Sequence, residues 1–172
     1  MKQLFVIDLK DYNDGDEIVR RPSARGIIFK NNKIALVYSK KEKYYKFPGG
    51  GINDNEDKKA ALIREIREEV GLVVIPDTIF EFGTVMRRQK SNFSANKIFE
   101  QENFYYFCEV EEKKVEQDLD DYEKDAEFVL EYVDLAKAIK TNSAFKSDDF
   151  FDEIMIQRDT KVLQMIKETI TN

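Results

Sequence analysis

The stretch 49–72 constrains this chain more than any other, because it joins three successive glycines to a predicted helix that is rich in carboxylates. Glu65, Glu68 and Glu69 are spaced i, i+3 and i+4, so they project from neighbouring points on one helix face. A solvated charged face is the usual reason for such a run, but it would more often mix signs than pair Glu65 with Glu69 at i, i+4. The spacing therefore indicates a face that presents acid.

The same helix has a second face that can pack against a core. At 3.6 residues per turn, Leu62, Ile63, Ile66 and Val70 gather beside the carboxylates. A hard divalent cation at the acidic face would relieve the repulsion, because such cations prefer oxygen ligands. Mg2+ is the first expectation, with Mn2+ as the alternative. Since Mg2+ usually keeps water or phosphate oxygens in its remaining positions, the site implies a phosphate substrate.

The order of residues in this stretch resembles the Nudix box, which is the signature of the Nudix hydrolase family. The residues that carry the resemblance, with no fixed position missing, are Gly50, Glu56, Arg64, Glu65, Ile66, Glu68, Glu69, Gly71 and Leu72. The resemblance implies an α+β fold, a Nudix-like α/β/α sandwich with a central mixed β-sheet. Because the signature covers only a small part of the chain, it indicates the fold family and reaction class better than the substrate.

The resemblance also implies a reaction, the Mg2+-dependent hydrolysis of a phosphoanhydride bond. The substrate would be a nucleoside diphosphate linked to another group: a nucleotide sugar such as ADP-ribose, a dinucleoside polyphosphate or a nucleoside triphosphate. Glu65, Glu68 and Glu69 would hold the metal, and the backbone carbonyl of Gly49 would face it. The metal would polarise the phosphoryl oxygens and lower the pKa of an attacking water.

Other roles implied by the resemblance belong to residues around this metal site. Glu56 and Arg64 would form a buried ionic contact that orients the turn against the helix. Many Nudix enzymes take one more carboxylate from a region just before the last strand, where Glu123 and Glu127 are the candidates. The sequence does not choose between these two. For the general base, Glu68 or Glu65 is preferred to either of them.

Two other functions compete with this prediction. One is a nucleotide-sanitising triphosphate pyrophosphatase of the same family, which would remove oxidised or non-standard nucleotides. The other belongs to a different class, a non-catalytic nucleotide-binding sensor or interaction module that kept the fold and lost turnover. Every acid of the signature is present, which favours an enzyme, because degenerate relatives usually lose a metal ligand.

Length and composition exclude several classes. The 172 residues suit a single domain over 1–172 with a sizeable core, and the net charge of -6 argues against a surface for duplex nucleic acid. No apolar run approaches a membrane span and the early acidic residues do not suit a secretory signal, so a cytoplasmic protein is expected. The absence of histidine excludes Ser-His, Cys-His and His-metal mechanisms, and the single Cys108 is expected to be a buried thiol.

The hydrophobic pattern predicts the elements around the box. Strands are expected over 4–8, 24–29, 33–39, 78–86, 102–109 and 127–133. Asn31 and Asn32 suit a two-residue hairpin turn, and 33–39 is apolar in both phases, which is typical of a strand covered on both faces. Helices are expected over 58–70, 135–140 and about 158–170. Asp57 is the expected cap of the first helix, with Asn53 or Asn55 as rivals. The last helix would pack on the domain or on a second subunit in a homodimer.

Polar segments near the box supply candidate substrate-binding residues. The segment 87–96 is basic and has no apolar periodicity, so it is expected to be a loop, either one that meets a phosphate or simply a solvated one. Arg87 and Arg88 in this segment, together with Lys46 before the glycines, are the candidates. The segment 111–125 is expected to be an exposed excursion. The aromatic residues before the glycines could stack a base or pack in the core: Tyr44, Tyr45 and Phe47.

Overall fold

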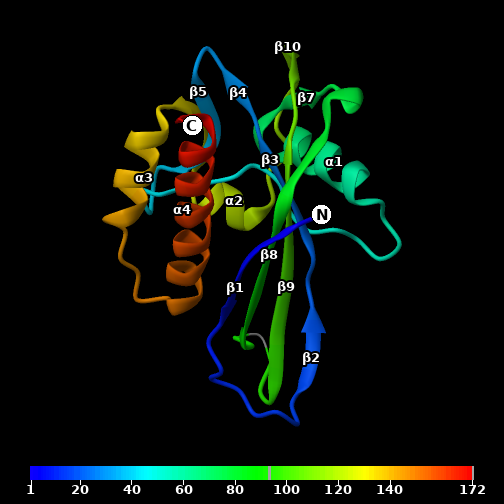
Figure 1. The fold of residues 1–172 in the computed structure, drawn as a ribbon, viewed down its shortest axis with the longest axis vertical. Helices are drawn as coiled ribbons and strands as arrows, with labels where there is room; N and C mark the ends of the chain where they lie inside the picture. The colour runs from blue at the N-terminus through cyan, green and yellow to red at the C-terminus, as the bar shows by residue number, and fades with distance from the viewer. Residues whose placement is uncertain (93, 172) are drawn as a thin grey trace.

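The computed structural model describes residues 1–92 and 94–171. Its larger sheet has five strands, in which the two longest, β8 and β9, pair antiparallel. β1 runs parallel to β8, whereas β2 and β3 run parallel to β9, so the sheet is mixed. Figure 1 shows β1, β2, β8 and β9 extending together beyond the helices. The bounds of these strands are β1 Gln3–Asp8, β2 Glu17–Arg20, β3 Ser23–Ile27, β8 Phe80–Lys90 and β9 Lys97–Phe107.

The second sheet is built around β5 (Lys33–Ser39), which lies between β11 (Phe128–Val133) and β4 (Phe29–Lys30). The short β6 (Tyr45–Lys46) also pairs with β5. Asn31 and Asn32 have φ angles of 52° and 62°, as a tight hairpin turn between β4 and β5 requires. The predicted hairpin is thereby confirmed.

The helices cover the sheets from two sides. α1 (Lys58–Val70) packs against β3, while α3 (Leu135–Ser143) and α4 (Phe150–Thr171) pack against each other on the opposite side (Figure 1). The side chains of consecutive residues of β5 point alternately to the two sides. Val37 belongs to the core beneath α1 and Leu36 to the core beneath α4. This arrangement confirms the α/β/α sandwich with a central mixed sheet, and it confirms that β5 is covered on both faces.

Local signals define the two ends of α1. The Asp57 side chain accepts hydrogen bonds from the backbone N–H groups of Lys59 and Ala60, at 2.9 and 3.1 Å. Asp57 is therefore the cap, in preference to Asn53 and Asn55. At the other end Gly71 has a φ of 67°, and its N–H donates to the Arg67 carbonyl. Both ends of the helix lie where the sequence predicted them.

Small elements complete the chain. They are η1 (Pro76–Thr78), α2 (Asp121–Asp125) and the antiparallel pair of β7 (Leu72–Val74) with β10 (Val110–Lys114). The exposed excursion expected over 111–125 therefore contains the end of a strand and a short helix. Cys108 is buried as expected, and burial raises the pKa of its thiol to about 12. None of the helices in the described part of the chain is long and apolar enough to cross a membrane.

The segment 87–96 and the last helix also differ from the prediction, and β9 begins at Lys97 where the sequence predicted residue 102. The segment 87–96 was expected to be a loop, but its first four residues continue β8 and pair with β9; Phe93 lies outside the described residues. The loop prediction was wrong because alternate polar side chains there are buried against α4, where apolar periodicity does not reveal a strand. The last helix was expected over about 158–170 but begins at Phe150, where Asp149 Oδ1 accepts a hydrogen bond from the Phe151 N–H at 2.8 Å.

Candidate active site

The glycine turn lies directly beside β3. The Ala24 N–H donates to the Gly50 carbonyl at 3.0 Å, and the Gly26 N–H donates to the Pro48 carbonyl at 2.8 Å. Gly49, between these contacts, has a φ of 128°, and a Cβ on it would lie 2.1 Å from the Ala24 carbonyl oxygen. Only glycine fits this position, because the backbone conformation and the lack of space both exclude a side chain.

The next glycine of the turn makes room for a carboxylate of α1. A Cβ on Gly50 would lie 2.0 Å from Glu65 Oε2, whereas a Cβ on Gly51 would meet nothing within 4 Å. Burial raises the pKa of the Glu65 carboxyl, and the positive charges of Arg64 and Arg25 oppose this rise. The turn and the helix are therefore fitted to each other at Gly50 and Glu65.

Arg64 ties the turn to the helix. Its Nε and Nη2 each donate to one oxygen of Glu56 at 2.8 Å, and Nη2 also donates to the Gly51 carbonyl at 3.0 Å. Its Nη1 donates to Glu65 Oε1 at 2.6 Å and to Glu68 Oε2 at 3.1 Å. The bonds from Arg64 lower the pKa of Glu56 to about 2. Glu56 and Arg64 thus lie as an orienting pair would.

Glu69 is the most deeply buried carboxylate of the box, with 2% of its surface exposed. Its Oε2 accepts the Gly49 N–H at 2.9 Å, and its Oε1 lies 2.6 Å from Lys46 Nζ. The same ammonium lies 4.1 Å from the centre of the Phe128 ring. Although the Lys46 charge is this close, Oε1 accepts no hydrogen bond within the described residues. Lys46 therefore meets the box as an ionic partner of Glu69.

The two late acids lie in different surroundings. Glu123, on α2, caps its own helix, since its Oε2 accepts the Asp120 N–H at 3.0 Å. Burial, together with the negative charge of Glu69, raises the pKa of Glu123 to about 7. Glu127 instead occupies an exposed turn before β11, with a φ of 51°. Of the two, Glu123 is the acid whose charge is coupled to the box.

The donor set of this site is made of hard oxygen ligands, and among the described residues the buried Oε1 of Glu69 has an ion-pair partner but accepts no hydrogen bond, so the chemistry fits a divalent cation such as Mg2+. As the side chains lie, no three acidic, cysteine or histidine side chains of the described residues are grouped to hold a metal ion. The carboxylates instead contact positive charge: Glu69 lies 2.6 Å from Lys46, and Glu65 and Glu68 lie 2.6 and 3.1 Å from Arg64. The Gly49 carbonyl, expected to face the metal, accepts a hydrogen bond from Arg25 Nη1.

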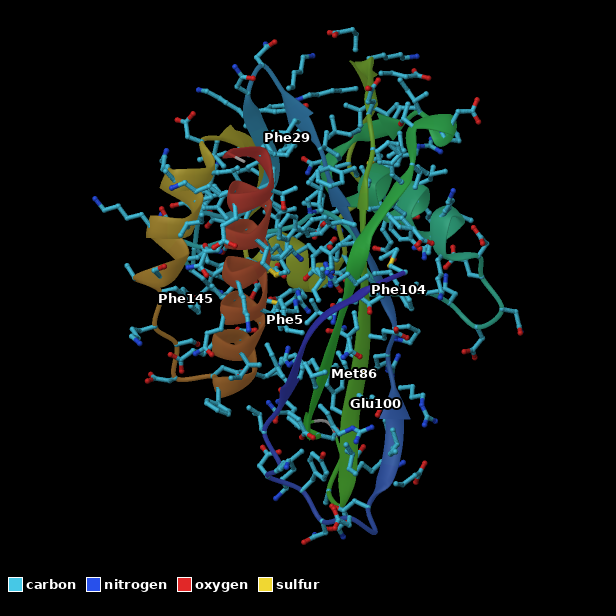
Figure 2. The ribbon with its side chains drawn as sticks, in the orientation of Figure 1. Phe5, Phe29, Met86, Glu100, Phe104 and Phe145 are labelled. Carbon is cyan, nitrogen blue, oxygen red and sulfur yellow. The ribbon has the colours of Figure 1, made fainter. Side chains whose placement is uncertain are left out.

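The other predicted substrate-binding residues lie away from these contacts. Arg87 is buried, and it donates from Nε to Gln89 Oε1 and from Nη2 to the Phe151 carbonyl, both at 2.7 Å. Burial lowers the pKa of Arg87 to about 9. Arg88 forms an ion pair with Glu100, which is labelled on the long strands in Figure 2. Within the described residues, neither arginine makes a hydrogen bond or ion pair with a box residue.

The aromatic residues before the glycines belong to the core. Tyr44, Tyr45 and Phe47 are at most 2% exposed. Tyr44 contacts the rings of Phe128 and Phe145, and Phe47 contacts Tyr105, in edge-to-face geometry. Core packing therefore accounts for them, and no base-stacking surface is needed to explain their positions.

Arg25 is a charged residue at the turn that the sequence analysis did not select. It lies on β3 and is 8% exposed. The available signal was a single charged residue between Ala24 and Gly26 in a run that is otherwise apolar. A charge at such a position must find a buried partner, so the residue that carries it is a candidate for a functional role.

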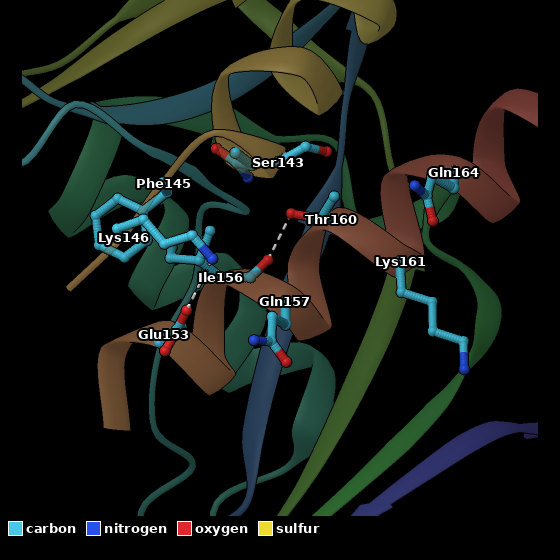
Figure 3. Close-up of a pocket in the computed structure, with 10 residues that line it drawn as sticks. Ser143, Phe145, Lys146, Glu153, Ile156, Gln157, Thr160, Lys161 and Gln164 are labelled. Carbon is cyan, nitrogen blue, oxygen red and sulfur yellow. Dashed lines mark hydrogen bonds and ion pairs between the residues drawn. The ribbon is translucent and has the colours of Figure 1, made fainter. Parts of the chain in front are cut away.

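Grooves open on both sides of the box. One, of about 570 Å³, lies beside α1 and is lined by Arg64, Arg67 and Glu68 together with Glu116 and Asp118. Another, of about 680 Å³, lies beside the turn and includes Arg20, Arg21, Gly51, Asn53 and Asn55 in its lining. A third groove, of about 390 Å³, lies between α3 and α4 and has no box residue in its lining (Figure 3).

Comparisons with curated proteins find similarity over part of the chain. An 8-oxo-dGTP diphosphatase from Buchnera aphidicola subsp. Schizaphis graminum (strain Sg) is 44% identical over 54 residues, which is 29% of this chain and 42% of that protein. An RNA pyrophosphohydrolase from Haemophilus influenzae (strain PittEE) is also 44% identical over 54 residues, 30% of this chain and 27% of that protein. The chain thus spans less than half the length of these relatives.

Comparison with solved structures extends over most of the chain. A NUDIX hydrolase from Nitrosomonas europaea has a TM-score of 0.54 at 14% identity, covering 81% of this chain and 89% of that one. A putative nudix hydrolase family member from Chromobacterium violaceum has a TM-score of 0.50 at 21% identity, covering 91% and 82%. These structures share the fold. The family model described as NUDIX domain matches residues 19–154. Since that match covers more than half of the chain and includes the complete box, this protein belongs to the Nudix family.

Proposed function

We propose that this protein hydrolyses a phosphoanhydride bond in a nucleoside diphosphate linked to another group, with Mg2+ as its cofactor. Nudix proteins generally use divalent metal ions and act on nucleotides. The observation that carries the proposal is the complete box, whose Glu65 packs on Gly50 and whose Glu69 binds the Gly49 N–H. A turn and a helix fitted in this way bring the carboxylates to a backbone that a phosphate can approach closely.

Glu65, Glu68 and Glu69 would hold the cation, with the Gly49 carbonyl and Glu123 beside them. When bound, the cation supplies charge that polarises phosphoryl oxygens and lowers the pKa of water. The chain itself supplies position. Arg64, paired with Glu56, holds the turn against α1 through five hydrogen bonds, two to Glu56 and one each to Gly51, Glu65 and Glu68. These bonds keep the carboxylates oriented.

The proton from the attacking water would pass to a carboxylate of the site. Glu68 or Glu65 is the proposed base, whichever of the two is free of metal when substrate is bound, because a carboxylate that binds a metal is a poor base. Glu123 is the proposed additional acid in preference to Glu127, since its charge is coupled to Glu69 while Glu127 lies on an exposed turn.

A nucleotide-sanitising triphosphate pyrophosphatase is the second candidate. The similarity over 54 residues to a protein named 8-oxo-dGTP diphosphatase favours it. The similarity to proteins named RNA pyrophosphohydrolase adds the 5′ triphosphate of RNA to the substrates worth testing. A non-catalytic sensor is disfavoured because no acid of the box has been replaced.

A substrate panel tests the proposal. The protein is incubated with Mg2+ and ADP-ribose, other nucleotide sugars, dinucleoside polyphosphates, nucleoside triphosphates including 8-oxo-dGTP, and 5′-triphosphorylated RNA. The release of phosphate, pyrophosphate or nucleoside monophosphate is then measured. We expect Mg2+-dependent hydrolysis of at least one class. Nucleotide binding without hydrolysis across the whole panel would establish the sensor instead.

Two variants assign the activity to the box. Glu68→Gln is the better probe, because 42% of the Glu68 side chain is exposed and its loss should leave the fold intact. We expect it to lower turnover by roughly tenfold or more. Glu168→Gln, on the exposed face of α4, is the matched control and should behave as the unaltered protein. Equal turnover in both variants would remove Glu68 from the site.

A further inference from the structure

Arg25 combines a buried charge with a position at the glycine turn. On β3 its neighbours face α1, since Ala24 belongs to the core beneath that helix and a Cβ on Gly26 would lie 2.6 Å from Ile66 Cδ1. Arg25 therefore starts from the opposite face of the strand, where its register partner on β9 is Tyr105. From there its Nη1 reaches the Gly49 carbonyl.

The bonding of Arg25 is incomplete. The bond from Nη1 to Gly49 is its one hydrogen bond within the described residues, and its buried Nε has no partner there. No carboxylate of the described residues forms an ion pair with it. Two other buried arginines make more bonds. Arg158 pairs with Asp159 at 2.8 Å, although its Nη2 also has no hydrogen-bond partner among the described residues, and Arg87 donates to Gln89 and to the Phe151 carbonyl.

A buried guanidinium with an unused N–H group is suited to bind an anion. Burying a charge is unfavourable unless the charge is paired and its donors are used. The guanidinium presents its N–H groups as a planar fork that matches the oxygens of a phosphate. Among the described residues, a bond to a neutral carbonyl leaves the Nε–H of Arg25 without a hydrogen-bond acceptor and its positive charge without a carboxylate in contact.

The chemistry around Arg25 indicates which anion would reach it. Arg25 contacts the carbonyl of Gly49, and the N–H of the same residue donates to Glu69. The positive charge of Arg25 also opposes the rise in the pKa of Glu65. Arg25 and the proposed metal ligands therefore share one short segment of backbone. A diphosphate at this turn would offer oxygens to both.

We propose that Arg25 binds a phosphate group of the substrate at the glycine turn, beside the carboxylates of α1. The inference rests on the proposed function, because it needs a phosphoanhydride substrate at the box. A purely structural Arg25 would only fasten the turn through Gly49, and the two roles predict different binding behaviour.

The probe is methylenebisphosphonate, a diphosphate analogue whose P–C–P link cannot be hydrolysed. It is titrated calorimetrically into the protein in the presence of Mg2+. We expect Arg25→Met, which removes the charge at a similar side-chain length, to weaken binding at least tenfold. Arg25→Lys keeps the charge but not the fork and should lie between the two. Lys137→Met removes an exposed positive charge on α3, at a residue that lines neither groove beside the box, as the matched control and should bind as the unaltered protein.

Thermal unfolding with and without Mg2+ accompanies each titration. An unchanged Mg2+-induced rise in melting temperature, together with weaker bisphosphonate binding, supports phosphate binding by Arg25. Equal bisphosphonate affinity in Arg25→Met and the unaltered protein overturns it. If Arg25→Met does not fold, Arg25→Lys decides: a loss of about threefold or more supports the inference and no loss overturns it.

The two proposals fail separately. Hydrolysis of a panel substrate with bisphosphonate affinity that ignores Arg25 would overturn this inference alone. Arg25-dependent bisphosphonate binding without hydrolysis of any panel substrate would overturn the proposed function and leave the phosphate site standing.

Discussion

Glu123 is a carboxyl whose ionisation depends on folding. Burial and the charge of Glu69 raise its pKa from 4.5 to about 7. Between these values the folded protein holds a proton that the unfolded chain has released, so stability falls as the pH rises. The contribution of Glu123 to the free energy of unfolding is complete below about pH 4.5 and is lost as the pH rises through about 7.

We therefore expect Glu123→Gln, in the metal-free protein, to raise the free energy of unfolding by on the order of 1 kcal/mol near pH 8 and to change it little near pH 4. The figure is small because Glu123 is only half buried and solvent screens its charge. Glutamine can still accept the Asp120 N–H. Urea unfolding in EDTA at the two pH values measures the effect, with exposed Glu111→Gln as control. An effect equal at both pH values would contradict the assignment.

Lys46 and Glu69 form a buried ion pair, with side chains 9% and 2% exposed. Removing one partner of such a pair leaves an uncompensated charge, which costs about 3–5 kcal/mol. A cation bound by Glu69 would compensate for the same charge. Lys46 and a metal bound there would therefore be alternative partners of this carboxylate.

We expect Lys46→Met to lower the free energy of unfolding by about 3 kcal/mol in EDTA, and to regain much of that loss in millimolar Mg2+. The rise in melting temperature caused by Mg2+ should be larger in this variant than in the unaltered protein. Lys137→Met, at an exposed position of α3, controls for the loss of a lysine. Mg2+ shifts of the same size in all three proteins would argue against a metal at Glu69.

At the scale of elements, the turn and α1 act as one unit because their close contacts allow little adjustment. The space beside Gly50 is filled by the Glu65 carboxylate, whereas the space beside Gly51 is open. Neither glycine has a positive φ, so the two differ in their neighbours and not in backbone strain. Substitutions at these two glycines can therefore distinguish a displaced Glu65 carboxylate from a less flexible turn.

Gly50→Ala should displace the Glu65 carboxylate, since the new Cβ would lie 2.0 Å from Oε2. We expect at least a tenfold loss of Mg2+-dependent turnover, because a small misplacement of a metal ligand is costly for catalysis. Gly51→Ala should retain turnover. Steady-state kinetics on a panel substrate, with circular dichroism to verify folding, makes the comparison. Equal losses in the two variants would show that turn flexibility, and not Glu65, is at issue.

At the scale of the whole molecule, α3 and α4 hold the strand that leads to the glycine turn. The Asn142 side chain bonds both the N–H and the carbonyl of Tyr45 at 2.8 Å. Asp159 accepts the Tyr105 hydroxyl at 2.9 Å and the Phe47 N–H at 3.3 Å. The C-terminal helices therefore support the active-site backbone from the side opposite α1.

Asp159→Ala should be strongly destabilising, by about 3–5 kcal/mol, because it leaves Arg158 charged and buried without its partner. Urea unfolding gives the free energy, and Asp148→Ala, at an exposed position before α4, is the matched control. A loss below about 1 kcal/mol would mean that α4 is fastened mainly by its apolar contacts.

The features of the fold that the sequence predicted correctly depend on residues close together in the chain. The caps of α1, the hairpin at Asn31 and Asn32 and the doubly covered β5 all follow from short-range rules on hydrogen bonding, backbone conformation and periodicity. The last helix was placed by its apolar spacing, but its first turns were missed because 150–157 carries no clean stripe. Arg87 was misplaced in a loop because polar residues that face a polar partner leave no periodic signal.

The sequence by itself determined the box, the helix that presents it and the family to which the chain belongs, since these depend on residues close together in the chain. Only the tertiary structure decided that the charge of Glu69 acts on Glu123, that Lys46 pairs with Glu69, and that Arg25 reaches the glycine turn. These contacts join segments that strand pairing and helix packing bring together. Burial then shifts the pKa values of the titratable groups among them. Neither the proximity nor the burial of these residues can be predicted from local spacing.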